Sequence, residues 1–159
     1  MRRMMSRIKL KVNETKTHIC QVPAETFDFL GYTFGRCYTP QTGRAYLGTR
    51  PARAKVQKLC RSLSELTDRK SLRLDPEEMV GRFNSRLRGW ANYFRLGAVS
   101  KAYRAVERHA TGRLRKWLCR KHKVPGQGTA RFPDAYLFQT LGLVRLTCLP
   151  RRYPQRKRE

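Results

Sequence analysis

The hydrophobic pattern of the chain changes its period at Pro51, which divides the 159 residues into a strand region and a helical region. Before this point, "FDFLGYTFG" alternates aromatic residues with small or polar ones, the period-two pattern of a strand. After it, apolar residues recur at the spacing of one helix face: Val56, Leu59, Leu63 and Leu66. The pattern predicts an α+β fold in which a short sheet precedes a group of helices.

The first fifty residues contain two further candidate strands. One is "THICQV", and the other is "AYLGTRP", which is expected to return after the loop at residues 39–44. Gly31 and Gly35 lie where strands bend or turn. Upstream, the stretch "MMSRIKLKVNETKT" is expected to hold the end of a helix.

Two more helices are predicted after the first. Asp75 is expected to cap the second helix, with Pro76 at its first position, and the helix is expected to run to about Leu96 and stop at Gly97. Ser100 is expected to cap the third. Its apolar side comprises Tyr103, Val106, Ala110, Leu114, Trp117 and Leu118. Three helices with short links predict a small bundle.

The hydrophobic pattern and composition of the sequence divide the chain into three parts. Residues 1–50 form the β region, residues 51–123 the helical domain, and residues 124–159 a basic, loop-rich extension. Within the extension we expect one short helix and one strand. No apolar run approaches 18 residues, so no membrane-spanning segment is expected.

The charge of the chain indicates a polyanionic partner. Lys and Arg number 36 against 11 Asp and Glu, which gives a formal net charge of +25. A field of this strength points to nucleic acid or to an anionic membrane.

The second predicted helix combines apolar and cationic faces. Its apolar stripe comprises Met79, Phe83, Leu87, Trp90, Ala91 and Phe94, and we interpret this stripe, like Trp117, as core. Between Arg82 and Arg95 the helix has four arginines and no acid, which favours phosphate binding on its flanks. The third helix repeats the pattern. The predicted RNA-binding residues are Arg82, Arg86, Arg88, Asn92, Tyr93, Arg95, Arg104, Arg108, Arg113, Arg115, Lys116, Arg120 and Lys121.

Side chains that would indicate an independent enzyme are scarce. The five cysteines are scattered and include no Cys-x-x-Cys motif, so neither a disulfide framework nor a zinc site is expected. Cys119 and His122 have ligand-like spacing, but no second pair accompanies them. We therefore expect no metal, no cofactor, reduced cysteines and a cytoplasmic location.

Four segments in order resemble the C-terminal part of group II intron-encoded reverse transcriptases, which are also maturases. They are "FDFLGYTF" (27–34), "YLGTRP" (46–51), "LRGWANYFRLG" (87–97) and "RLRKWLCRKH" (113–122). The upstream "LKVNETKT" (10–17) looks like the stretch before the family's last palm strands. The resemblance covers nearly the whole chain and weakens after Lys123.

The resemblance implies a role for each part of the chain. Residues up to about 50 would be the end of the palm, with a primer-grip-like turn at Phe29, Leu30, Gly31 and Tyr32. Residues 51–123 would be the thumb, or X domain, which in the family clasps intron RNA and the template–primer duplex and assists splicing. The last thirty or so residues would correspond to the DNA-binding appendage.

One departure from the family decides the expected function. The family's polymerase site needs a Tyr-x-Asp-Asp motif to hold two metal ions, and this chain has no Asp-Asp pair. We therefore expect a truncated or split reading frame that encodes an RNA-binding maturase module without catalysis of its own. DNA or an RNA–DNA duplex is a further expected partner.

Two alternatives remain open from the sequence. The chain is a polymerase fragment that acts only with a separate fingers–palm polypeptide, or it is a basic amphipathic protein that binds membranes. The membrane alternative ranks last because the apolar helix faces are needed for packing.

Overall fold

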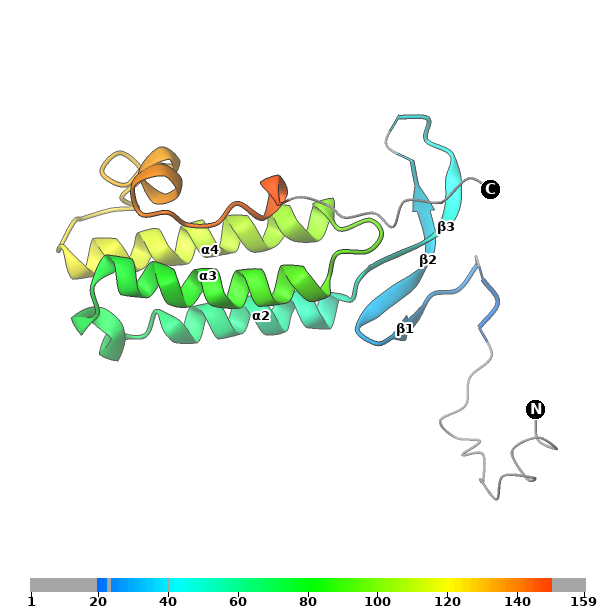
Figure 1. Cartoon of the computed structure of the whole chain (residues 1–159), viewed down its shortest axis with the longest axis horizontal. Coiled ribbons are helices and arrows are strands. Elements are labelled where there is room, and N and C mark those ends of the chain that lie inside the picture. The colour runs from blue at the N-terminus through cyan, green and yellow to red at the C-terminus, as the bar shows by residue number, and fades with distance from the viewer. Residues whose placement is uncertain (1–19, 23, 40, 150–159) are drawn as a thin grey trace, which may run out of the picture.

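The structure is a computed structural model that describes residues 20–22, 24–39 and 41–149. A small sheet lies at one end of an elongated three-helix bundle, and the C-terminal part of the described chain lies along the side of that bundle (Figure 1). The elements follow in the order β1 (Phe27–Phe29), β2 (Tyr32–Tyr38), β3 (Ala45–Pro51), α2 (Arg53–Leu66), η1 (Arg69–Arg73), α3 (Pro76–Tyr93), α4 (Ser100–Lys121), η2 (Tyr136–Thr140) and η3 (Leu146–Cys148). The predicted α+β class is confirmed.

The sheet is an antiparallel meander in the order β1-β2-β3. Phe27 of β1 pairs with Phe34 of β2, and their rings stack with centroids 5.0 Å apart. The expected strand at "AYLGTRP" is confirmed as β3. The expected strand "THICQV" is wrong for its described residues 20–22, which are not in a strand. Its residues 17–19, and the expected helix end at 4–17, lie outside the described residues.

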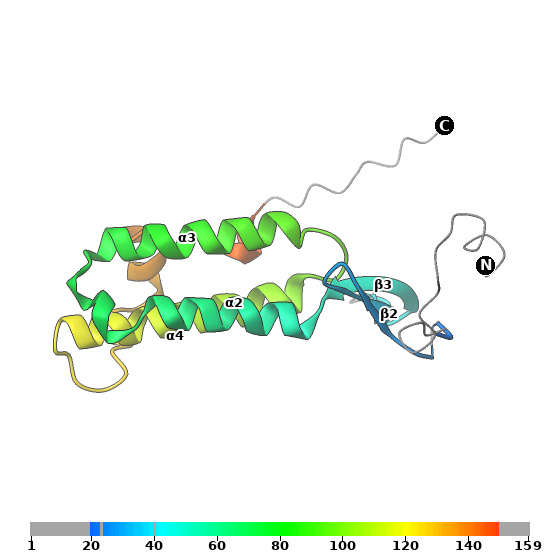
Figure 2. The same cartoon turned by 90° about the horizontal axis from the view of Figure 1, so that it is seen from below.

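The three helices run along one another, and each pair is in contact (Figures 1 and 2). α3 begins at Pro76 as expected, but the side chain of Asp75 makes no capping hydrogen bond. The cap predicted for α4 is also wrong, because Val99 occupies the N-cap position and Ser100 is the first helical residue. The sequence pattern thus located the starts of α3 and α4. The capping hydrogen bonds depend on the local backbone geometry, which the pattern does not show.

α3 ends at Tyr93, three residues before the expected position, because the next segment turns toward the sheet. The amide of Ala98 donates a hydrogen bond to the carbonyl oxygen of Thr49 in β3 at 2.7 Å. Gly97 has a φ of +77°, and a Cβ on it would lie 2.1 Å from the same Thr49 oxygen. Glycine at this position therefore lets the α3–α4 link approach β3.

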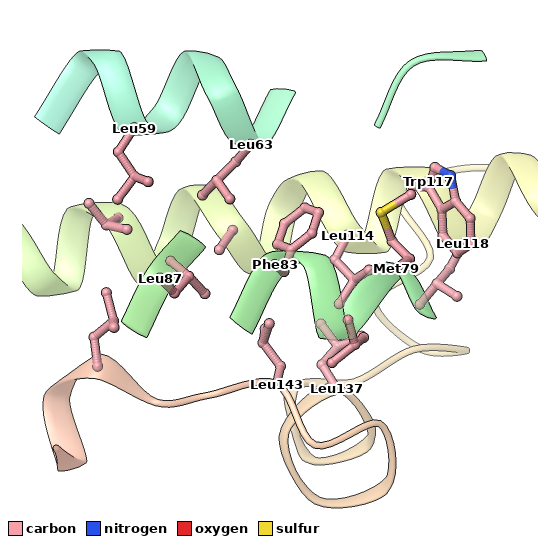
Figure 3. Close-up of a cluster of buried hydrophobic side chains, with 14 of the residues drawn as sticks. Leu59, Leu63, Met79, Phe83, Leu87, Leu114, Trp117, Leu118, Leu137 and Leu143 are labelled. Atoms are coloured by element: carbon pink, nitrogen blue, oxygen red, sulfur yellow. The ribbon is translucent and has the colours of Figure 1, made fainter. Parts of the chain in front are cut away.

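The core is formed by facing side chains of all three helices and of the C-terminal segment. Figure 3 shows Leu59 and Leu63 pointing from α2 toward α3 and α4, while Leu137 and Leu143 enter from the opposite side. The largest fully buried side chains include Trp117, Phe83, Leu63, Met79, Leu87, Leu114, Leu118, Leu137 and Leu146. The apolar periodicity of the three helices is confirmed by this burial.

The two tryptophans differ in their surroundings. Trp117 is 1% exposed, as expected, and its Nε1–H donates to the Ser71 hydroxyl at 3.1 Å. Trp90 is only partly buried, packed against Phe94 and Tyr103 at the edge of the core. Trp90, which was expected to belong to the core, thus packs against the core cluster but remains partly accessible.

The described part of the C-terminal extension packs on the bundle. Phe132, Leu137, Leu143 and Leu146 belong to the same hydrophobic core as the helices. The expected short helix is present as the π-helical turn η2, whereas residues 141–149 contain no strand. The apolar spacing in "YLFQTLGLVRL" is thus satisfied by burial against α3 and α4.

Candidate nucleic-acid interface

α4 carries a row of exposed cations on its outer face. Eight Lys and Arg residues and a single acid, Glu107, lie between Ser100 and Lys121. Arg104, Arg108, Lys116 and Arg120 are exposed, as is Lys101. Long cationic side chains on one helix surface provide the positive field that a phosphate backbone requires.

Arg113 and Lys121, two other predicted cations of α4, make hydrogen bonds inside the protein. Arg113 donates from Nε to the Thr67 hydroxyl at 2.9 Å and from Nη2 to the Ser64 carbonyl oxygen at 3.0 Å. Lys121 donates to the carbonyl oxygens of Leu72 and Leu74 at 3.1 and 2.8 Å. These contacts attach α4 to the end of α2 and to the η1 link.

Arg115 attaches the C-terminal segment to α4. Its side chain is 14% exposed, donates from Nε to the Phe132 carbonyl oxygen at 2.9 Å, and forms an ion pair with Asp134. RNA contact by Arg113, Arg115 and Lys121 stays a prediction.

The predicted cations of α3 also divide by their surroundings. Arg82 forms an exposed ion pair with Glu78 at 2.8 Å, so an acid four residues upstream reaches the arginine flank. Arg88 is exposed. Arg95, also exposed, donates from Nε to the carbonyl oxygen of the exposed Asn92 at 2.8 Å. Glu78 lies just outside the acid-free range 82–95, and its i, i+4 spacing from Arg82 is the sequence signal for this ion pair.

The primer-grip-like turn rests on the end of α3. Leu30 and Gly31 form the β1–β2 turn with φ values of +49° and +80°. Tyr93 donates from its hydroxyl to the Leu30 carbonyl oxygen at 2.8 Å, and Tyr32 donates to the Tyr93 carbonyl oxygen at 2.8 Å. Phe29 beside the turn is exposed. The fold thus brings two sets of predicted residues together, although they are about sixty positions apart in the chain.

A groove of about 570 Å³ opens where this turn, α2 and α3 meet. Lys55 and Lys58 of α2 line it, and neither was among the predicted residues. The helical spacing of Lys55, Lys58 and Ser62 places all three on one face of α2, but this spacing does not show that the face lies beside α3 and the β1–β2 turn. The remaining lining residues are Leu30, Gly31, Leu59, Trp90, Tyr93 and Phe94.

His109 lies at the contact between α2 and α4. Its Nε2 is 2.9 Å from the Cys60 carbonyl oxygen and 3.0 Å from the Ser64 hydroxyl. Burial lowers the pKa of His109 below its usual value, and the positive charges of Arg113 and Lys116 lower it further, while the hydrogen bond with Cys60 raises it. The neutral imidazole is therefore the form that this contact favours.

The described residues 20–22, 24–39 and 41–149 hold neither a metal-binding cluster nor a membrane-spanning helix. No group of three His, Cys, Asp or Glu side chains there is arranged to hold a metal ion, including the neighbourhood of Cys119 and His122. None of the helices in that same part of the chain combines the length and the apolar character of a membrane span.

The helical part of the chain matches a known family model. Residues 56–133 match the family model described as "Group II intron, maturase-specific domain". The matched range covers most of α2, all of η1, α3 and α4, and the start of the C-terminal segment. No curated protein matches the chain.

Proposed function

Because residues 56–133 match the family model of the group II intron maturase-specific domain, we propose that the chain binds group II intron RNA and assists the splicing of that intron. The family match is the observation that carries the proposal, and the charge distribution supports it. In this role the chain contributes binding and not polymerase chemistry, since no Asp-Asp pair occurs in its sequence.

The proposed RNA surface consists of the exposed predicted residues. On α4 these are Arg104, Arg108, Lys116 and Arg120, and on and after α3 they are Arg88, Asn92, Tyr93 and Arg95. Arg82 and Arg86 are exposed as well, although Arg82 forms an ion pair with Glu78 at 2.8 Å and the Nη1 of Arg86 donates to the Ser62 carbonyl oxygen at 2.7 Å. All of these residues except Arg95 belong to α3 or α4, whose relative positions are held by the core in Figure 3.

The proposal is tested with the full chain and a group II intron RNA from the same genome. We expect tighter binding to that intron than to a transfer RNA of similar charge, and faster splicing at limiting Mg²⁺ when the protein is present. An RNA–DNA duplex added as competitor measures the further expected partner. Equal binding to all polyanions with no effect on splicing would contradict the proposal.

The surface of the sheet favours a second candidate function, docking to a separate fingers–palm polypeptide. Six of the eight large hydrophobic residues that are exposed in the described part of the chain lie between residues 27 and 47: Phe27, Phe29, Leu30, Tyr38, Tyr46 and Leu47. An apolar concentration of this kind marks a protein interface. Co-purification with a chain that carries Tyr-x-Asp-Asp, abolished by Leu47→Lys, would support this function.

A further inference from the structure

The groove between α2, α3 and the β1–β2 turn combines apolar walls with cations at its opening. Leu59, Trp90 and Phe94 supply apolar surface, and Lys55 and Lys58 are exposed beside them. No Asp or Glu is among the nine lining residues. The groove therefore offers a ligand both a site for a flat apolar group and a site for negative charge.

The ring of Tyr93 is fixed in this groove although its side chain is largely exposed. The residue is 56% exposed, yet its hydroxyl donates to the Leu30 carbonyl oxygen at 2.8 Å. Its ring also contacts Phe94 edge-on, with centroids 4.7 Å apart, and lies 6.2 Å from the ring of Tyr32. An exposed aromatic ring that is held from two sides loses little conformational entropy when a planar group stacks on it.

The polar groups of the groove fit a nucleotide. Arg86 reaches the end of the groove that lies at Ser62, which adds a third cation to the two lysines. The Nε1–H of Trp90 is buried and has no hydrogen-bond partner within the described chain. Because this N–H is buried, the groove offers a ligand the ring surface of Trp90 and not a free donor.

We propose that this groove binds one unpaired nucleotide of the RNA, with its base against Tyr93 and Trp90 and its phosphate at Lys55 and Lys58. The proposal rests on the function proposed above and specifies the state of the RNA that the groove selects. Duplex RNA keeps its bases stacked inside the helix, whereas unpaired bases stack on aromatic side chains. The groove is therefore a site for a loop, a bulge or a single-stranded junction.

The first experiment uses the tryptophan fluorescence of the full chain. The probes are a ten-nucleotide oligouridylate, a duplex RNA of equal phosphate number, and uridine monophosphate. We expect the oligouridylate to quench part of the fluorescence and the duplex to quench much less. Trp117, the other tryptophan, is 1% exposed and is therefore not accessible to the RNA. Trp90→Phe is expected to remove the quenching for this reason.

The second experiment compares two double variants of α2 that lose the same charge. Lys55→Gln with Lys58→Gln changes the groove, whereas Arg53→Gln with Arg61→Gln changes exposed cations of the same helix that do not line it. We expect the groove variant to weaken oligouridylate binding by about tenfold, and the control by less than about threefold. Both should weaken duplex binding equally. Lys58→Gln alone is used if Lys55→Gln disturbs the turn at Gly31, where an added Cβ would lie 3.2 Å from Lys55 Cε.

The outcomes separate the two proposals. Binding of oligouridylate and duplex with equal affinity and without quenching overturns the groove proposal and leaves RNA binding by the helix faces intact. Quenching by uridine monophosphate at the same concentration as by the oligouridylate also overturns it, because the groove would then be a site for a free nucleotide. Failure of every RNA to bind overturns the proposed function itself.

Discussion

Tyr32 and Tyr93 join the sheet to the helical bundle: the hydroxyl of Tyr32 in β2 donates to the carbonyl oxygen of Tyr93 at the end of α3, at 2.8 Å. The Tyr93 hydroxyl returns a hydrogen bond to Leu30, so the β1–β2 turn and the helix end are linked in both directions. Because Tyr32 is also buried, this junction holds the two parts of the molecule by packing and by hydrogen bonds.

Replacing Tyr32 with phenylalanine is expected to weaken this junction. The ring contacts would remain, while the buried hydrogen bond to Tyr93 would be lost, at a cost of about 0.5–1.5 kcal/mol in the free energy of unfolding. Tyr38→Phe is the matched control, because Tyr38 is exposed in the same strand, and a change within about 0.5 kcal/mol is expected for it. Urea denaturation followed by circular dichroism measures both. Equal effects of the two substitutions would show that the hydrogen bond contributes nothing.

Asn84 is expected to hold the C-terminal segment on the bundle. Its side-chain amide donates to the Gly142 carbonyl oxygen, and its side-chain oxygen accepts from the Val144 amide, both at 2.8 Å. Asn84→Ala should therefore destabilise the protein by about 1–3 kcal/mol and speed amide exchange between residues 142 and 146. Asn92→Ala, on the same flank but exposed, should do neither. Unchanged exchange in Asn84→Ala would contradict the assignment.

The parts of the fold that the sequence predicted are those that depend on local pattern. The apolar spacing of residues 53–66, 76–93 and 100–121 determined three amphipathic helices, and their buried faces are the ones expected. The alternation in residues 27–35 likewise indicated strand structure, which the turn at Leu30 and Gly31 divides into β1 and β2.

The groove could not be predicted in the same way. Nor could the distinction between exposed cations and cations that bond to groups within the protein, because both features depend on contacts between residues far apart in the chain. Lys55 and Tyr93 meet only through the packing of α2 on α3, and Arg115 is occupied only because Asp134 folds back onto α4. Nothing in the local sequence distinguishes Arg115 from the exposed arginines of α4. A count of basic residues on a helix therefore does not show which of them already have partners within the protein.

The free energy of unfolding is expected to fall in mild acid because the folded state disfavours protonation of His109. Its pKa is lowered in the folded state, chiefly by burial, so below the unfolded value of about 6.5 the unfolded chain binds the proton more readily. The contribution of neutral His109 is thus complete above that pH and is lost as the pH falls. We expect His109→Gln to lose less stability than the native chain between about pH 7.5 and pH 5.5. Urea denaturation at the two pH values tests this, and identical losses would show that His109 is not responsible.

Arg88 and Arg115 carry the same charge, and their replacement by alanine is expected to have opposite consequences. Arg88 is exposed on α3, so Arg88→Ala should leave the free energy of unfolding within about 0.5 kcal/mol of the native value. It should reduce the slope of log affinity for RNA against log salt by about 0.7–0.9, the change expected when one phosphate contact is lost.

Arg115→Ala should instead destabilise the protein by about 1–3 kcal/mol, because it leaves the Phe132 carbonyl oxygen and Asp134 without their partner. Under conditions where this variant remains folded, its salt slope should equal that of the native chain. Denaturation curves beside RNA titrations at several salt concentrations measure both quantities for each variant. If Arg115→Ala lowers the salt slope without lowering stability, Arg115 contacts RNA directly and its ion pair with Asp134 opens on binding.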